Sequence, residues 1–199
     1  KNSRKINQLN YIYSNFKLEM KVLITGATGL IGSRIVKDCL ERDIKVNFLT
    51  TRKDKLDSLP GCDGFYWNPQ KNIIDINCFH EIDSIINLSG ASIFRIWTKK
   101  NKELILNSRV QSLNFLREKI IENNIKIHSF VSASGIGAYP SSDEKEFYET
   151  ESDRSDYFLS DVIKEWEKAA ISFEKAVEKV SIVRRSEEHT SELQSPVTI

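Results

Sequence analysis

Strand and helix patterns alternate along this chain of 199 residues, and the alternation predicts an α/β fold with a doubly wound parallel sheet. The first two elements indicate it most clearly. Lys21–Thr25 is a short run of strand-forming residues, and a helical pattern over Ile31–Arg42 follows it almost at once. The glycine-rich stretch Gly26–Gly32 joins them, and strand, glycine turn and helix in this order form a phosphate cradle. The sequence therefore predicts a Rossmann-type domain.

The later elements follow from their own residue patterns. Thr98 is expected to cap a long helix whose apolar face extends to Ile121, and a second long helix is expected over Phe158–Val177. The acidic stretch Asp143–Asp156 between them is predicted to be an exposed loop. Short apolar runs predict the remaining strands, at Lys45–Thr50, Phe65–Trp67, Ser84–Leu88, His128–Ser132 and Val180–Val183.

Composition limits the class of protein. The chain is 40% hydrophobic with a formal net charge of +1, which describes one soluble domain with its own core. The near-neutral charge argues against nucleic acid or an anionic membrane as partner, and no apolar run approaches the length of a membrane span. The three cysteines lack metal-ligand spacing. We expect reduced thiols, no metal site and a cytoplasmic location, with an organellar stroma or matrix left open.

The glycine-rich turn carries the strongest functional signal. Gly26 permits a tight turn, Gly29 lets the backbone approach a pyrophosphate, and Gly32 lets the helix lie close to the sheet. The unpaired N–H groups at the start of the helix suit an anion. An ordinary structural turn is the alternative. The predicted dinucleotide site includes Gly26, Thr28, Gly29, Leu30, Ile31 and Gly32.

Two other strand tips add to this site. An NAD-preferring site would place an acidic residue after the second strand, but here Thr51 and Arg52 follow it. A guanidinium pairs well with a 2′-phosphate, so NADP(H) is favoured over NAD(H), with Arg52 as the clamp and Thr51 as a helper. A solvated arginine is the alternative. Leu88, Ser89 and Gly90 close the strand Ser84–Leu88, either beside the cofactor or as a simple turn into a loop.

Several motifs together resemble a known family. Gly26–Gly32, Asn87–Gly90 and Ser132–Tyr139 resemble the short-chain dehydrogenase/reductase superfamily, in its extended or atypical branch. Further signatures are similar to the NAD-dependent epimerase/dehydratase family and, within it, to the SulA-like (cell-division-inhibitor-like) epimerase subfamily. These are Arg95–Thr98, Ile105–Val110, Ser132–Ser134, Asp156–Leu159 and Trp166-Glu167. The resemblance covers Met20–Arg184.

The resemblance implies a catalytic serine and a Tyr-x-x-x-Lys pair, in which the lysine lowers the pKa of the tyrosine phenol. Ser134 matches the serine, and Tyr157 can be aligned with the tyrosine. Asp161 stands where the lysine is expected, so the pair is broken. The alternative for Tyr157 is an aromatic residue that packs at a helix start. Tyr139 and Arg109 are weaker candidates for contact with cofactor or substrate.

The ends of the chain are expected to be foreign to the fold. Residues 1–19 are polar and precede Met20, and we interpret them as a non-native or disordered extension. Residues 185–199 begin with what looks like a translated sequencing adaptor, and we interpret them as an artefact tail. Residues 20–184 are then an NAD(P)-binding Rossmann domain. The resemblance implies that it is truncated before the C-terminal substrate-binding part.

The expected function is that of an NADP(H)-binding protein similar to short-chain dehydrogenases/reductases. The resemblance implies oxidoreduction, or the epimerisation or dehydration of a nucleotide sugar. The alternative is a non-catalytic NADP-binding sensor or scaffold, which the broken Tyr-x-x-x-Lys pair favours. The sequence identifies neither the small-molecule substrate nor the oligomeric state.

Overall fold

The computed structural model describes residues 20–94, 96–140, 144–149 and 157–185. Within these residues seven strands form one sheet, in the order β4-β3-β2-β1-β5-β6-β7. Neighbouring strands are parallel except for β3 and β4. This confirms the predicted parallel sheet. The strands are β1 (Lys21–Thr25), β2 (Lys45–Thr50), β3 (Asp63–Asn68), β4 (Ile73–Ile74), β5 (Ser84–Asn87), β6 (Ile127–Gly135) and β7 (Val177–Arg185).

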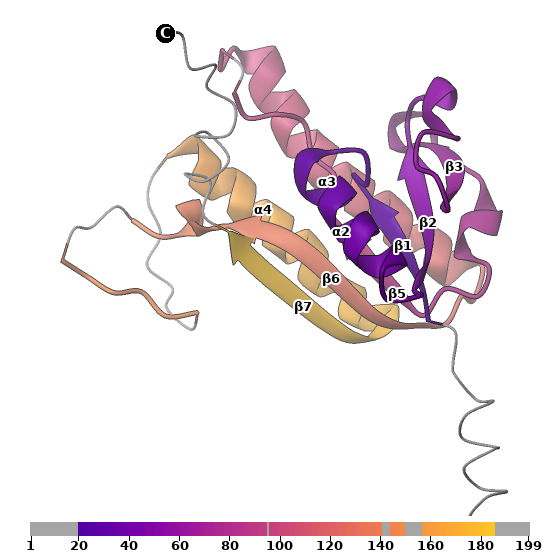
Figure 1. Ribbon diagram of the computed structural model, residues 1–199. Helices are drawn as coiled ribbons and strands as arrows, with labels where there is room; N and C mark the ends of the chain where they lie inside the picture. The colour runs from indigo at the N-terminus through magenta and orange to yellow at the C-terminus, as the bar shows by residue number, and fades with distance from the viewer. Residues whose placement is uncertain (1–19, 95, 141–143, 150–156, 186–199) are drawn as a thin grey trace, which may run out of the picture.

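Helices cover both faces of the sheet. In Figure 1, α2 (Leu30–Leu40) lies in front of the sheet, and α3 (Lys99–Glu122) and α4 (Phe158–Ile171) lie side by side behind it. The alternating side chains of β1 supply both cores: Leu23 packs in the core that includes α3 and α4, whereas Val22 and Ile24 pack in the core that includes α2. The fold is therefore a doubly wound, Rossmann-like α/β fold.

The order of the strands places a crevice between β1 and β5. From β1 the chain passes through α2 to β2 on one side, and it later returns to β5 on the other side of β1. From β5 it continues outward through α3 to β6 and through α4 to β7. In open parallel sheets a ligand binds where the strand order reverses, outside the carboxyl ends of the strands. Here that point lies beyond Thr25 and Asn87.

The second long helix is shorter than the sequence predicts. It ends at Ile171, a 3₁₀ turn covers Ser172–Lys175, and Val177 begins β7 instead of ending the helix. Phe173 still reaches the core, because the 3₁₀ turn stacks its ring on Phe130 with centroids 3.8 Å apart. Helical spacing of apolar residues therefore continued past the helix itself.

Other differences are confined to element ends. Thr98 does cap α3, accepting a hydrogen bond from the Asn101 N–H, but Ile121 is exposed instead of buried. Helix α2 ends two residues before Arg42, because Asp43 takes a left-handed conformation with φ of 58°. The short antiparallel strand β4 was not predicted.

Some sequence-based predictions concern residues outside the described ranges. These are the extension 1–19, Arg95, most of the acidic stretch 143–156, and residues 186–199. Within that stretch, Glu144–Glu149 is described, and all of it except Phe147 is exposed. Arg185 is described as the last residue of β7, paired with Gly135. No helix in the described ranges combines the length and the apolar character required to cross a membrane.

Candidate dinucleotide-binding site

The turn after β1 is built so tightly that two of its glycines admit no side chain. Gly26 has a φ of +75°, and a Cβ there would lie 2.9 Å from the Leu88 carbonyl carbon and oxygen. A Cβ on Gly32 would lie 2.2 Å from the Gly26 carbonyl oxygen. The turn is closed by the Gly29 N–H, which donates to the Gly26 oxygen at 3.0 Å. The β1 turn, the start of α2 and the segment after β5 are thereby held together.

Gly29 has a different part in the turn. It is the N-cap of α2, with extended backbone (φ −82°, ψ 174°), and has no side chain to cap the helix. A Cβ there would meet only the Gly26 oxygen, at 3.3 Å. The first N–H groups of a helix have no partner within the helix, and the helix dipole adds partial positive charge. The start of α2 is therefore suited to an anion.

A line of buried polar side chains joins three neighbouring strands at the level where β1 and β5 end. The Thr25 hydroxyl donates to Asn87 Oδ1 at 2.7 Å, and Asn87 Nδ2 donates to Ser132 Oγ at 3.1 Å. The Ser89 N–H and hydroxyl donate to Thr25 Oγ1 and Asn87 Oδ1. Thr25, Asn87 and Ser132 are each at most 1% exposed. These bonds fix the floor of the crevice and the course of the chain after β5.

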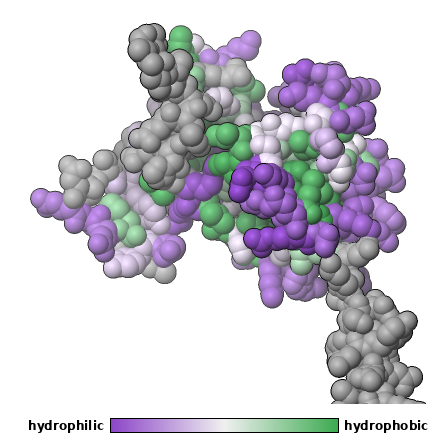
Figure 2. Space-filling model, in the orientation of Figure 1, coloured by the Kyte–Doolittle hydropathy of each residue, from purple (hydrophilic) through white to green (hydrophobic). Residues whose placement is uncertain are grey.

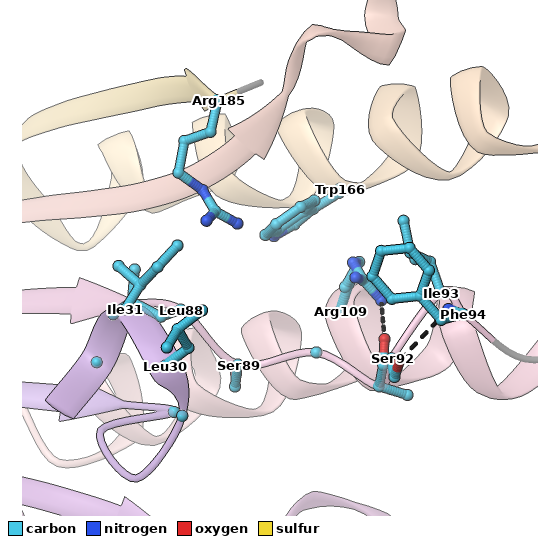
Figure 3. A pocket seen from close by; sticks show the side chains of 15 residues that line it. Leu30, Ile31, Leu88, Ser89, Ser92, Ile93, Phe94, Arg109, Trp166 and Arg185 are labelled. Atoms are coloured by element: carbon cyan, nitrogen blue, oxygen red, sulfur yellow. Dashed lines mark hydrogen bonds between the residues drawn. The ribbon is translucent and has the colours of Figure 1, made fainter. Parts of the chain in front are cut away.

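Two cavities meet at the glycine turn. The larger, of about 540 Å³, lies toward β2 and β3 and is called here the Trp67 cavity. The smaller, of about 330 Å³, lies toward α4 and is called the Trp166 cavity (Figure 3). Both are lined by Gly26, Gly29, Leu88, Ser89, Gly90 and Ala91. The two cavities thus form one cleft with the glycine turn at its middle.

Helix α3 holds the wall between the cavities. The Ala91 N–H donates to Ser108 Oγ at 2.8 Å, and Arg109 Nη1 donates to the Ala91 carbonyl at 3.1 Å. The same Arg109 nitrogen donates to the Ile105 carbonyl at 3.0 Å. A Cβ on Gly90 would lie 2.8 Å from the Arg109 Cζ, so the segment after β5 passes directly over this guanidinium. The segment after β5 is therefore held to α3 through both the N–H and the carbonyl of Ala91, and it forms a fixed wall of the cleft.

Hydrophobic surface borders the cleft. Leu30 and Phe94, which line the Trp166 cavity, are 53% and 64% exposed. Figure 2 shows hydrophobic surface at the centre of the face seen there, flanked by hydrophilic side chains. The cleft thus combines apolar walls with a polar floor, as small-molecule sites commonly do.

Ten of the eleven residues predicted to bind the cofactor line one cavity or both. Thr28 and Thr51 line the Trp67 cavity. Leu30, Ile31 and Gly32 line the Trp166 cavity, and the remaining five are among the shared residues.

Arg52 lines neither cavity. It lies just after β2, where its Nε and Nη2 donate to Asp54 at 3.1 Å and 2.5 Å. This hydrogen bond lowers the pKa of Asp54 and raises that of Arg52. The predicted clamp is at the expected strand tip, but it is paired with a carboxylate.

The two predicted catalytic residues bind different partners. Ser134 is 2% exposed, and its hydroxyl donates to Glu167 Oε1 at 2.7 Å. Arg184 Nε and Nη2 donate to the same carboxylate at 2.8 Å and 2.9 Å, and this hydrogen bonding raises the pKa of Arg184. Tyr157 is the N-cap of α4, and its phenol donates to the Gly137 carbonyl at 3.4 Å. Neither Ser134 nor Tyr157 lines the two cavities of the cleft.

Sequence reasoning missed part of the cleft. On α3 the polar residues Asn107, Ser108, Gln111 and Ser112 line the Trp67 cavity. Their spacing of three and four residues places them on one face of the helix and was a usable signal. Trp67 and Gln70 were also missed, because their place beside β2 depends on the pairing of β3. Trp166, named above only as part of a family signature, packs in the core and also lines its cavity.

This fold and cleft define a Rossmann-type α/β domain. The sequence matches the model of the NAD dependent epimerase/dehydratase family over residues 22–183, and the chain belongs to this family. Among curated proteins, an epimerase family protein of Staphylococcus haemolyticus is 34% identical over 164 residues, which is 82% of this chain and 54% of that protein. One from Staphylococcus saprophyticus is 36% identical over 162 residues, 81% of this chain and 53% of that protein.

Solved structures share the fold. Human epimerase family protein SDR39U1, solved with NADPH, superimposes with a TM-score of 0.61 and 24% identity, over 76% of this chain and 48% of that one. UDP-glucuronic acid 4-epimerase from Bacillus cereus, solved with UDP-glucuronic acid and NAD, superimposes with a TM-score of 0.67 and 19% identity, over 83% of this chain and 56% of that one. The chain thus spans about half the length of the proteins it matches.

Proposed function

We propose that the chain binds one nicotinamide dinucleotide across the two cavities, with NADP(H) preferred over NAD(H). The observation that carries the proposal is that both cavities meet at the glycine turn. A dinucleotide is two nucleosides joined by a pyrophosphate, and the start of α2 is suited to that anion. Gly26 and Gly32 leave no room for a Cβ, so the backbone itself forms the cradle.

The two cavities suit different halves of the ligand. The Trp67 cavity includes Thr51 at the tip of β2, the place where Rossmann domains bind the adenosine ribose. Asn107 and Gln111 of α3 offer amide groups in the same cavity. The Trp166 cavity, on the other side of the turn, is then assigned to the nicotinamide half. The chemistry that a bound nicotinamide supplies is hydride transfer.

The proposed preference for NADP(H) rests on Arg52. To hold a 2′-phosphate, its guanidinium would exchange the Asp54 carboxylate for the phosphate, and it can bind either anion bidentately. Relatives in fold have been solved with either cofactor, NADPH in the human protein and NAD in the Bacillus cereus enzyme. Arg52 is therefore the residue on which the choice is tested.

For the longer protein we propose the chemistry of its family, namely oxidoreduction or the epimerisation or dehydration of a small molecule such as a nucleotide sugar. We place it in the SulA-like subfamily, in the cytoplasm, without a nucleic acid or membrane partner. Ser134 and Tyr157 are its candidate catalytic residues.

A second candidate function is favoured by a specific observation. The Ser134 hydroxyl donates its hydrogen bond to the buried Glu167 carboxylate, and Asp161 stands where the catalytic lysine would be. A protein that binds NADP(H) as a sensor or scaffold, without catalysis, needs neither group.

The binding proposal is tested with Gly29→Asp. Aspartate is a favourable N-cap residue and the backbone at this position is extended, which offsets the close 3.3 Å approach of its Cβ to the Gly26 oxygen, so the variant should fold with a stability near that of the wild type. Its carboxylate would occupy the place proposed for the pyrophosphate and repel it. By calorimetry we expect wild-type protein to bind NADPH and the variant to lose binding more than about 100-fold. Equal affinity in a folded variant would contradict the proposal.

A further inference from the structure

Trp166 carries a polar atom that its surroundings do not satisfy. The side chain is 6% exposed and packs in the main core, yet it also lines the Trp166 cavity. Its indole Nε1 is buried and has no hydrogen-bond partner within the described residues. A buried donor without an acceptor is costly, and native proteins rarely retain one without a reason.

Another tryptophan of the chain shows the ordinary arrangement. Trp97 Nε1 donates to the Ile93 carbonyl at 3.0 Å, although this side chain is 41% exposed. The more exposed indole is therefore bonded within its own segment, while the more buried one is not. The contrast points to an acceptor for Trp166 that comes from outside the described residues.

The ring of Trp166 is held in place from the cleft side. The Arg109 guanidinium lies over it, with Cζ 5.0 Å from the ring centroid. Arg109 is itself fixed by the Ala91 and Ile105 carbonyls. Figure 3 shows Trp166 between the side chains of Arg109 and Arg185, across the cavity from Leu88 and Ser89. The donor therefore has a defined position at the end of the cleft remote from the Trp67 cavity.

Arg185 carries a second donor at this cavity. It also lines the cavity, and its Nε lacks a partner within the described residues. Because Arg185 is the first residue of the stretch 185–199 that we interpret as an artefact tail, we assign no ligand contact to it.

We propose that the indole N–H of Trp166 donates a hydrogen bond to the carboxamide oxygen of a bound nicotinamide. This inference rests on the proposed function, which assigns the Trp166 cavity to the nicotinamide half. The carboxamide oxygen is a neutral acceptor at the far end of the dinucleotide, and it matches the neutral indole donor. Arg109 acts as a positioning residue that keeps the indole plane in place.

The first test observes the donor directly. Tryptophan labelled with ¹⁵N in the indole gives one signal for each of Trp67, Trp97 and Trp166, assigned by single Trp→Phe variants of the 199-residue chain. NADPH should move the Trp166 indole proton downfield. The fragment 2′-phospho-ADP-ribose keeps both riboses and the pyrophosphate but lacks nicotinamide, and it should leave that proton nearly unmoved. Equal shifts with both ligands would overturn the inference in favour of a ribose contact.

The second test measures affinity. Trp166→Phe keeps an aromatic ring in the core but removes the indole N–H, and its ring is smaller than the indole. It should weaken NADPH binding about 3- to 10-fold, the effect of one neutral hydrogen bond, and leave 2′-phospho-ADP-ribose unchanged. Trp97→Phe is the matched control and should change neither affinity. Thermal unfolding of each variant verifies that it is folded.

The outcomes separate the two proposals. If the wild type binds neither ligand, the proposed function fails. If the wild type binds NADPH but the Trp166 signal stays in place, and Trp166→Phe binds as tightly, only the inference about Trp166 fails.

Discussion

Replacement of Arg184 by methionine should destabilise the domain strongly while leaving dinucleotide binding intact. Arg184 makes two hydrogen bonds to Glu167, whose side chain is only 5% exposed. Without the guanidinium, the Ser134 hydroxyl still donates to this carboxylate, but the compensating charge is gone. Removing one partner of a buried pair costs about 3–5 kcal/mol. Because the Arg184 side chain is 20% exposed, we expect the lower end, about 3 kcal/mol.

The assay is urea unfolding of a double-mutant cycle. Glu167→Leu together with Arg184→Met removes both charges, and the double variant should recover at least about 1 kcal/mol of the single variant's loss. Ser134→Ala should cost about 1 kcal/mol and leave NADPH affinity unchanged, since neither cavity of the cleft includes Ser134. If Arg184→Met lowers the free energy of unfolding by less than about 1 kcal/mol, the pair is screened like a surface ion pair and the reasoning is refuted.

Three further predictions concern the cleft and the core. Arg52→Ala should weaken NADPH binding about tenfold and leave NADH binding unchanged. Asp54→Asn frees the guanidinium and should strengthen NADPH binding a few-fold. Fluorescence titration with both nucleotides checks this, and Asp57→Asn is the control for the loss of one negative charge. Gly32→Ala should cost about 1–3 kcal/mol by urea unfolding, because its Cβ would lie 2.2 Å from a backbone oxygen, and wild-type stability would contradict the geometry. Burial raises the pKa of the Cys78 thiol, so the folded chain keeps a proton that the unfolded chain loses above about pH 8.5. The free energy of unfolding should then fall as pH rises above that value, by up to about 1.4 kcal/mol per pH unit, and Cys78→Ala should flatten that slope.

The sequence predicted the part of the site that depends on local backbone. The glycine turn is encoded within seven residues, since Gly26 needs a left-handed φ and Gly32 needs to lie against the turn. The strand before it and the helix after it are equally local. This is why nearly all the predicted cofactor residues lie together in the cleft.

Contacts between distant segments were harder to predict. Asn87 looked like a strand end, but its role is to join β1 and β6 through Thr25 and Ser132, which are 62 and 45 residues away. Ser134 matched a catalytic pattern, yet its hydroxyl is bound by a glutamate 33 residues further along. The first set of contacts depends on the order of the strands in the sheet, and the second depends on how helix α4 packs on the sheet. No local pattern in a single sequence encodes either arrangement.

The proposal that one dinucleotide spans both cavities is tested most directly by following backbone amide NMR signals during titration with NADPH. The predicted result is that the largest shifts fall on Gly29, Leu30 and Ile31 at the turn, on Gly90 in the shared wall, and on Thr51 at the tip of β2. Shifts confined to one cavity, or shifts that avoid the glycine turn altogether, would contradict it.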